Sequence, residues 1–148
     1  MENFLASLPL IRERKMMAGA IRDDVPFAVI ATQDIAPVAA DALQKRNFVG
    51  TQIRELLGER DVTMKEVTEV LSRAIDTPEL QYQVLPPAEF IDSLTGAGFS
   101  ENGAKEMLEL SESINARRFA VEQPRTAINT TPTSIEDFSS AFADALRD

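Results

Sequence analysis

The feature that most constrains the fold is a short apolar segment followed at once by a helix signal. Residues Val25–Ala31 read Val-Pro-Phe-Ala-Val-Ile-Ala and follow a polar turn, Arg22-Asp23-Asp24. A continuous apolar run of this length, bounded by turn residues, predicts a strand that is buried on both faces. Asp34 can then cap a helix in which Pro37 is the third residue, a position where its missing N–H costs little. This segment predicts one strand–turn–helix unit of a wound α/β sheet.

The rest of the chain alternates between helical and extended patterns. Apolar spacing predicts helices over 2–17, 35–43, 63–75, 87–94, 100–114 and 133–146, and strands over 51–57 and 81–85. The pairs Thr63/Glu66 and Thr133/Glu136 form capping boxes that mark two helix starts. A threonine-rich loop is expected over 119–132. This order predicts a helix-rich α/β fold with few strands, in a single domain over residues 1–148.

Composition excludes several classes of chemistry. The net charge of −9 opposes binding to a phosphate backbone, so we expect no nucleic-acid partner. The chain has no histidine and no cysteine, which removes histidine-based catalysis, thiolate chemistry and disulfides. No apolar run is long enough to span a bilayer, and the start lacks a signal-peptide pattern. We therefore expect a cytoplasmic protein.

Three local motifs could carry chemistry, and each has a simpler interpretation. The stretch from Gly96 to Gly103 resembles a glycine-rich phosphate loop, but its last glycine comes too late and a helix precedes it, which favours a helix–helix connection. Tyr82 is the single tyrosine and has Pro86, not lysine, four residues later, so a half-buried strand residue is favoured over a catalytic one. The acidic pairs Asp23-Asp24 and Glu55 with Glu59 favour solvated surface over a metal site.

Four segments together carry a family resemblance. They are the opening Met1-Glu2-Asn3-Phe4-Leu5-Ala6-Ser7-Leu8-Pro9, then Ile30-Ala31-Thr32-Gln33-Asp34-Ile35-Ala36, Arg54-Glu55-Leu56-Leu57-Gly58, and Asn129-Thr130-Thr131-Pro132-Thr133-Ser134 before the last helix. Their order resembles the C-terminal half of NmrA-like proteins, atypical short-chain dehydrogenase/reductase relatives that bind NAD(P). The resemblance implies an incomplete Rossmann-like fold, with the last sheet strands and a small, mostly helical substrate domain. In such proteins the first half supplies the glycine-rich turn.

The same resemblance implies where a site would lie. Asn3 and Phe4 match a segment that borders the nicotinamide and substrate cleft, Asn3 as a hydrogen-bonding amide and Phe4 as an apolar wall. Leu80–Leu85 would belong to the substrate domain, with Tyr82 on its far side. We expect no cofactor on the isolated chain, and NAD(P)H if an N-terminal half is supplied. The expected partner is a second copy of the chain or a complementing N-terminal half.

Two functions from different classes remain open. The first is the substrate-domain portion of an NAD(P)H-dependent reductase-like protein that is inactive alone. The second is a non-enzymatic small-ligand-binding or protein-interaction module of the redox-sensor type. A glycine-rich strand–helix turn encoded directly before Met1 favours the first function, and its absence there favours the second.

Overall fold

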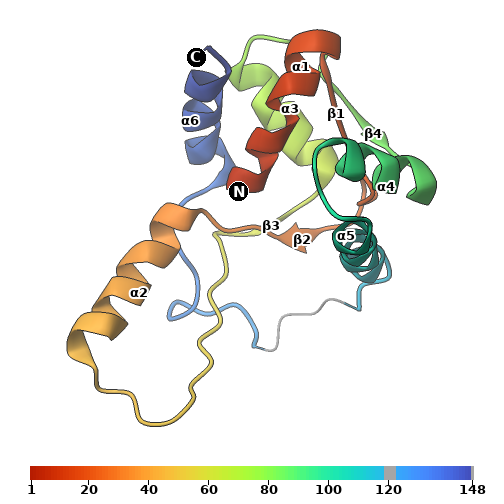
Figure 1. Ribbon diagram of the computed structural model, residues 1–148. Coiled ribbons are helices and arrows are strands. Elements are labelled where there is room, and N and C mark those ends of the chain that lie inside the picture. Colours follow the sequence, from red (N-terminus) through yellow and green to blue (C-terminus); the bar gives the residue numbers. More distant parts are fainter. Residues whose placement is uncertain (119–122, 148) are drawn as a thin grey trace.

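The computed structural model describes residues 1–118 and 123–147 and is a helix-rich α/β fold, as the sequence predicts. Its elements in chain order are η1 (Glu2–Ser7), α1 (Leu8–Arg14), β1 (Met16–Gly19), β2 (Phe27–Ala28), α2 (Thr32–Lys45), β3 (Asp61–Val62), α3 (Met64–Ala74), β4 (Gln81–Val84), α4 (Pro87–Gly96), α5 (Glu101–Asn115) and α6 (Ile135–Arg147). In Figure 1, α1, α3 and α6 lie together, α4 and α5 form a hairpin, and α2 projects away from both groups. Within the described ranges no helix is long and apolar enough to cross a membrane.

Two small sheets connect these helices. β1 pairs with β4 in parallel, with Met16 opposite Gln81 and Gly19 opposite Val84. β2 pairs with β3 in antiparallel orientation through two residues on each side. The strand predicted over 81–85 is therefore confirmed as β4, and its partner is a segment that the apolar pattern places in a helix.

The segment predicted as a helix over 2–17 is helical up to Arg14 but divides near Pro9, where a proline is expected to interrupt a helix, and it ends earlier than predicted. Glu2–Ser7 is a 3-10 helix, and α1 begins only at Leu8, with Pro9 in its first turn, where its missing N–H is tolerated. The helix ends at Lys15, which takes left-handed backbone angles with φ of 54°. Met16 then starts β1. Ile11 and Met16 are spaced as on a helix, but pairing with a strand 65 residues later decides the conformation.

The prediction that Val25–Ala31 is a strand buried on both faces is also wrong. Only Phe27 and Ala28 form a strand, and burial alternates along the segment, with Val25 and Val29 buried and Ala28 exposed. Its sheet has only two strands, β2 and β3, and the segment lies on the core with one face instead of within a covered sheet.

The start of α2 differs from the prediction because Asp34 has a distant partner. The helix begins at Thr32 with Ala31 as its N-cap, so Pro37 lies inside the helix and not in its first turn. Asp34 does not cap the helix; it accepts hydrogen bonds from the hydroxyl of Thr133 at 2.7 Å and from its backbone N–H at 3.0 Å. This pair joins α2 to the segment before α6, 99 residues away.

Residues Thr51–Leu57, predicted as a strand, form no regular strand among the described residues. Within the described part of the chain, the strand-like pairing of this segment is limited to an isolated parallel bridge between Leu57 and Thr130. The N–H of Leu57 donates to the carbonyl of Asn129 at 2.7 Å. The next residue, Gly58, has to be glycine, because a Cβ there would overlap the carbonyl oxygen of Val29. The rest of the predicted loop over 119–132 is irregular where it is described, and residues 119–122 lie outside the described part.

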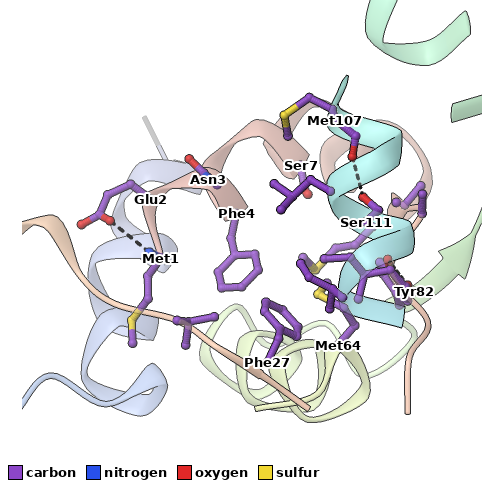
Figure 2. Close-up of a pocket in the computed structure, with 18 of the residues that line it drawn as sticks. Met1, Glu2, Asn3, Phe4, Ser7, Phe27, Met64, Tyr82, Met107 and Ser111 are labelled. Atoms are coloured by element: carbon purple, nitrogen blue, oxygen red, sulfur yellow. Dashed lines mark hydrogen bonds and ion pairs between the residues drawn. The ribbon is translucent and has the colours of Figure 1, made fainter. Parts of the chain in front are cut away.

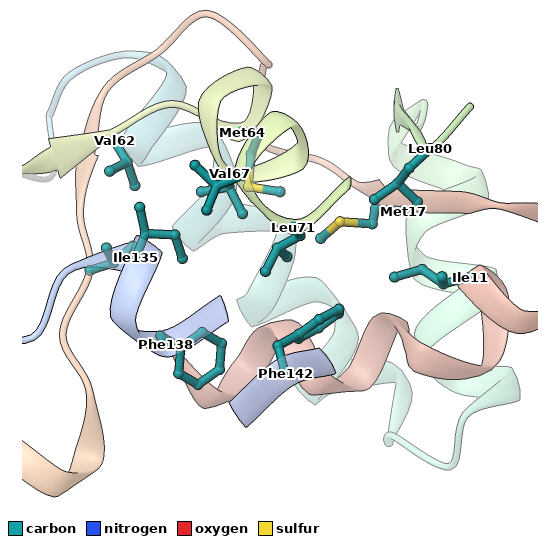
Figure 3. Packing of buried hydrophobic residues seen from close by; sticks show 12 residues of the cluster. Ile11, Met17, Val62, Met64, Val67, Leu71, Leu80, Ile135, Phe138 and Phe142 are labelled. Atoms are coloured by element: carbon teal, nitrogen blue, oxygen red, sulfur yellow. The ribbon is translucent and has the colours of Figure 1, made fainter. Parts of the chain in front are cut away.

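The hydrophobic core lies between α1, β1, α3 and α6 (Figure 3). Its largest fully buried side chains are Phe142, Ile11, Met17, Leu71, Ile135, Val62 and Val67. The rings of Phe138 and Phe142 are 6.4 Å apart and tilted. On the surface above this core, Arg60 binds the carboxylates of Glu66 and Glu136, which ties the start of α3 to the start of α6.

The two capping boxes have different outcomes. Thr63 caps α3 as predicted, accepting the N–H of Glu66 at 3.1 Å. The box at α6 lies one residue later than predicted, because Thr133 is bound to Asp34. Ser134 accepts the N–H of Asp137 at 3.0 Å, and the carboxylate of Asp137 accepts the N–H of Ser134 at 3.1 Å.

This assignment predicts that Ser134, directly before α6, stabilises the helix, whereas an exposed serine within α6 does not. Replacing Ser134 with alanine removes the cap, and we expect the free energy of unfolding to fall by about 1 kcal/mol. Ser140→Ala is the matched control, since Ser140 is exposed on the same helix, and it should change stability by less than about 0.5 kcal/mol. Urea denaturation followed by circular dichroism measures both. Equal stability of the two variants contradicts the assignment.

Candidate functional site

A pocket of about 490 Å³ lies where the start of the chain meets β1, β2 and α5 (Figure 2). One wall is η1, the second is the backbone from Ala18 to Ile21, and the third is the face of α5 that carries Met107 and Ser111. In Figure 2 the rings of Phe4 and Phe27 point into the space between these walls. The pocket therefore draws on segments that are far apart in the sequence.

The lining is mostly apolar, with many aromatic and methionine side chains. These are Phe4, Phe27, Tyr82 and Phe90, together with Met1, Met17, Met64 and Met107. Four of the five methionines in the chain thus line one pocket. Thioether side chains are flexible and polarizable and make favourable contacts with aromatic rings, so such a lining accommodates a flat apolar molecule.

Asn3 and Phe4, the two residues proposed from the family resemblance, both line this pocket. Phe4 is half-buried and packs against the hydrophobic core. Asn3 is exposed, and its side-chain amide forms no hydrogen bond with the described residues. Asn3 therefore has donor and acceptor groups available to a ligand, whereas Phe4 contributes an apolar wall.

Tyr82 is a half-buried residue of β4, as predicted, but its expected position on the far side is wrong. It lines the same pocket as Asn3 and Phe4. Its hydroxyl donates a hydrogen bond of 2.7 Å to the carbonyl of Ile21. Burial, and secondarily the negative charge of Asp23, raise the pKa of Tyr82 above its ordinary value. The phenol is therefore protonated near neutral pH, and its proton is engaged with the backbone.

Tyr82 also explains the glycine opposite it. A Cβ on Gly19 would lie 2.7 Å from the hydroxyl oxygen of Tyr82 and 3.6 Å from the ring carbon that carries it. Glycine at this position lets the phenol cross β1 and reach Ile21. The parallel pairing of β1 with β4 thus fixes one side of the pocket wall.

Asn115, at the end of α5, holds the other side of the same wall. Its amide nitrogen donates to the carbonyl of Ala20 at 2.9 Å, and its amide oxygen accepts the N–H of Arg22 at 2.8 Å. Sequence reasoning missed this residue, since an asparagine near a helix end has many uses and its partners lie more than 90 residues away. The wall from Gly19 to Arg22 is therefore held by two side chains from different elements.

Glu2 joins the pocket to the first turn of α2. Its carboxylate accepts hydrogen bonds from the hydroxyl of Thr32 at 2.7 Å and from its N–H at 2.9 Å. Burial taken alone would raise the pKa of Glu2, but the bonds from Thr32 outweigh it and hold the pKa at about 2. Glu2 is therefore ionised at neutral pH. It anchors η1 to α2 and has no proton to give.

These groups define what the pocket can do chemically. The two titratable side chains among its lining residues, Glu2 and Tyr82, have pKa values shifted away from neutrality in opposite directions. General acid–base catalysis works best with a pKa near the working pH. The arrangement is suited to binding and orienting an apolar molecule.

The other candidate motifs lie away from the pocket. Gly96 ends α4 and Gly98, with φ of 97°, turns the chain toward α5, so this stretch is the helix–helix connection favoured by the sequence. Asp24 pairs with Arg22, and Glu59 pairs with Arg60. Over residues 1–118 and 123–147, no three acidic, histidine or cysteine side chains gather as a metal site would require.

Comparison with known proteins gives a likeness of fold. No protein-family model and no curated protein sequence matches the chain. The solved structures that match include a new type of NADPH-dependent quinone oxidoreductase from Escherichia coli, with a TM-score of 0.73 and 22% identity, and that enzyme complexed with NADPH, with a TM-score of 0.71 and 21% identity. Each match covers 95% of this chain. The chain spans about half the length of these structures, 50% and 49%, and has the fold of their C-terminal half.

The contact between Gly19 and Tyr82 yields a double-variant prediction. Gly19→Ala should lower the free energy of unfolding by about 1–3 kcal/mol through overpacking. In a Tyr82→Phe background the same change should cost less, because the hydroxyl oxygen is the nearest atom.

Gly96→Ala serves as the control, since nothing lies within 4 Å of a Cβ there. Chemical denaturation of the unaltered chain, the two single variants and the double variant measures the coupling free energy between Gly19 and Tyr82. A cost of Gly19→Ala that is equal in both backgrounds would falsify the proposed contact.

Proposed function

We propose that this chain is the acceptor-binding half of an NAD(P)H-dependent reductase-like protein. In this proposal the pocket around Asn3, Phe4 and Phe27 holds a small, flat, uncharged acceptor such as a quinone or an apolar carbonyl compound. The observation that carries it is the pocket itself, which has a mostly aromatic and methionine lining and includes Asn3 and Phe4, the two residues that the family resemblance implies at a cleft. The fold likeness to half of a quinone oxidoreductase supports it.

The proposal assigns the dinucleotide to another part of the protein, because the described residues include no glycine-rich turn between a strand and a helix. A pyrophosphate is usually held by a glycine-rich turn between a strand and a helix, which presents backbone N–H groups. The glycine-rich stretch described here, Gly96 to Gly103, joins two helices. We therefore propose that the cofactor is held by residues of a complementing N-terminal half. The chain alone would then neither bind NAD(P)H tightly nor catalyse reduction of the acceptor.

Within this proposal each pocket residue has a limited role. Asn3 offers its amide to a carbonyl oxygen of the acceptor, and Phe4 and Phe27 hold the ring by packing. Tyr82 and Asn115 keep the wall from Gly19 to Arg22 in place. Glu2 fixes η1 on α2. These residues bind, orient and exclude water, and none of them transfers a proton.

The pKa values of the two titratable side chains in the lining, Glu2 and Tyr82, also fit a second function, a ligand-binding module of the redox-sensor type. Such a module needs the same pocket but no turnover. Adding a nucleotide-binding half and NADPH discriminates between the two functions. A reductase then oxidises NADPH in proportion to the acceptor, whereas a sensor binds the acceptor and leaves NADPH unoxidised.

Methionine methyl groups offer a direct test of the pocket. In a chain labelled with ¹³C at the methionine methyls, an uncharged naphthoquinone should shift the resonances of Met1, Met17, Met64 and Met107 and leave Met16 unchanged, because Met16 is the one methionine outside the lining. NADPH alone should leave all five unchanged at low-micromolar concentration. Shifts confined to Met16, or no shifts at all, contradict the proposal, and tight NADPH binding contradicts the division between two halves.

The same titration assigns roles to two residues. Asn3→Ala should raise the dissociation constant of the naphthoquinone about fivefold, which corresponds to one hydrogen bond of about 1 kcal/mol. Tyr82→Phe should change it less than Asn3→Ala does, because the Tyr82 hydroxyl donates to Ile21 and not to the ligand, and Asn115 still holds the wall. The reverse ranking would show that the residue assignments are wrong even if the pocket is right.

A further inference from the structure

Helix α2 has an apolar side, formed by Ile35, Val38, Ala39, Ala42 and Leu43, that the described chain covers only in part, at Val38. None of its residues is buried, and Ile35 and Leu43 are 39% and 68% exposed. Figure 1 shows the helix projecting from the remainder of the fold. Isolated helices of this length are marginal in water, and their stability normally comes from packing one apolar face. A covering partner is therefore missing from α2.

The segment after α2, residues 46–57, also exposes apolar side chains to solvent. Phe48, Val49 and Ile53 are 49%, 90% and 83% exposed. The sequence predicts a strand over 51–57, yet the backbone N–H groups of residues 51–54 form no hydrogen bond with the backbone of the described residues. Unpaired extended backbone with exposed apolar side chains is a surface that natural proteins normally pair or cover.

The two segments together specify the kind of surface that would cover them. A helix followed by a strand is the αβ unit of a wound sheet, in which the strand joins the sheet and the helix packs on one face. The sheets of the described chain each have two strands and are paired elsewhere. Leu57 already bridges Thr130, but the extended backbone before it has no sheet to join within the described chain. A sheet from outside this chain would pair that backbone and cover the apolar side of α2.

We propose that Ile35, Leu43, Phe48, Val49 and Ile53 form a docking surface for a partner α/β unit. Residues 51–57 add to the partner's sheet as a strand, and α2 covers the adjacent face. The partner is the complementing N-terminal half, so the inference rests on the proposed function and names its interface. The matched oxidoreductase structures contain about as much chain again as the part that this chain covers.

A second copy of this chain is a poorer occupant. Two copies could pair their 51–57 segments, but a ladder of two strands is marginal in water and offers no broad sheet face for α2. The net charge of −9 on each copy also opposes association. An α/β unit with its own sheet provides both an edge and a face.

The test uses the N-terminal half of the E. coli oxidoreductase, the part that this chain does not cover, as the probe. Co-expressed with a tagged full 148-residue chain, it should co-purify in a one-to-one complex. Hydrogen exchange at residues 51–57 should slow by about a hundredfold relative to the chain alone. The variants Leu43→Glu and Ile53→Pro should each abolish co-purification while leaving the melting temperature of the chain unchanged, because both side chains are exposed.

Phe99→Glu is the matched control, since Phe99 is 49% exposed but lies between α4 and α5, and it should co-purify normally. The inference is overturned if no complex forms, if the complex tolerates both variants, or if 51–57 becomes protected in the chain alone as its concentration rises, which would make a second copy the occupant. Naphthoquinone binding by the isolated chain is independent of these outcomes. A failure of docking is thus distinguishable from a failure of the acceptor pocket.

Discussion

The parallel pairing of β1 with β4 is the interaction on which the pocket depends. It joins segments 65 residues apart and places Tyr82 across Gly19, where the phenol reaches the carbonyl of Ile21. The neighbouring Met17 is buried in the core between the helices. One strand pair therefore connects the core on one side with the pocket wall on the other, and Asn115 completes that wall from α5.

Local signals explain how much of the fold could be predicted. Thr63 and Ser100 cap α3 and α5 through side-chain bonds to the N–H three residues on, and the sequence places both helices correctly. The family resemblance also placed Asn3 and Phe4 at a cleft, and both line the pocket. The two caps depend on residues close together in the chain, so a local pattern is sufficient to find them, whereas the cleft role of Asn3 and Phe4 stays a prediction.

Contacts between residues far apart in the sequence explain why some predicted caps, helix ends and residue positions are wrong. Asp34 reads as a helix cap, but it binds Thr133, which in turn moves the capping box of α6 to Ser134. Met16 fits a helical stripe but pairs with Gln81. The family resemblance implies a position for Tyr82 on the far side of the substrate domain, but the pairing of its strand with β1 places Tyr82 beside the pocket. In each case a contact made across the fold outweighs the local preference.

The chain thus has two apolar surfaces of different character, one concave and lined by flexible methionines, the other projecting and extended. The central claim is that the concave one binds a flat acceptor, and a crystal structure of the chain with a bound naphthoquinone tests it most directly. The account predicts the ring between Phe4 and Phe27, with one carbonyl oxygen within hydrogen-bond reach of the Asn3 amide. A quinone bound elsewhere, with the pocket closed by its own side chains, would contradict it.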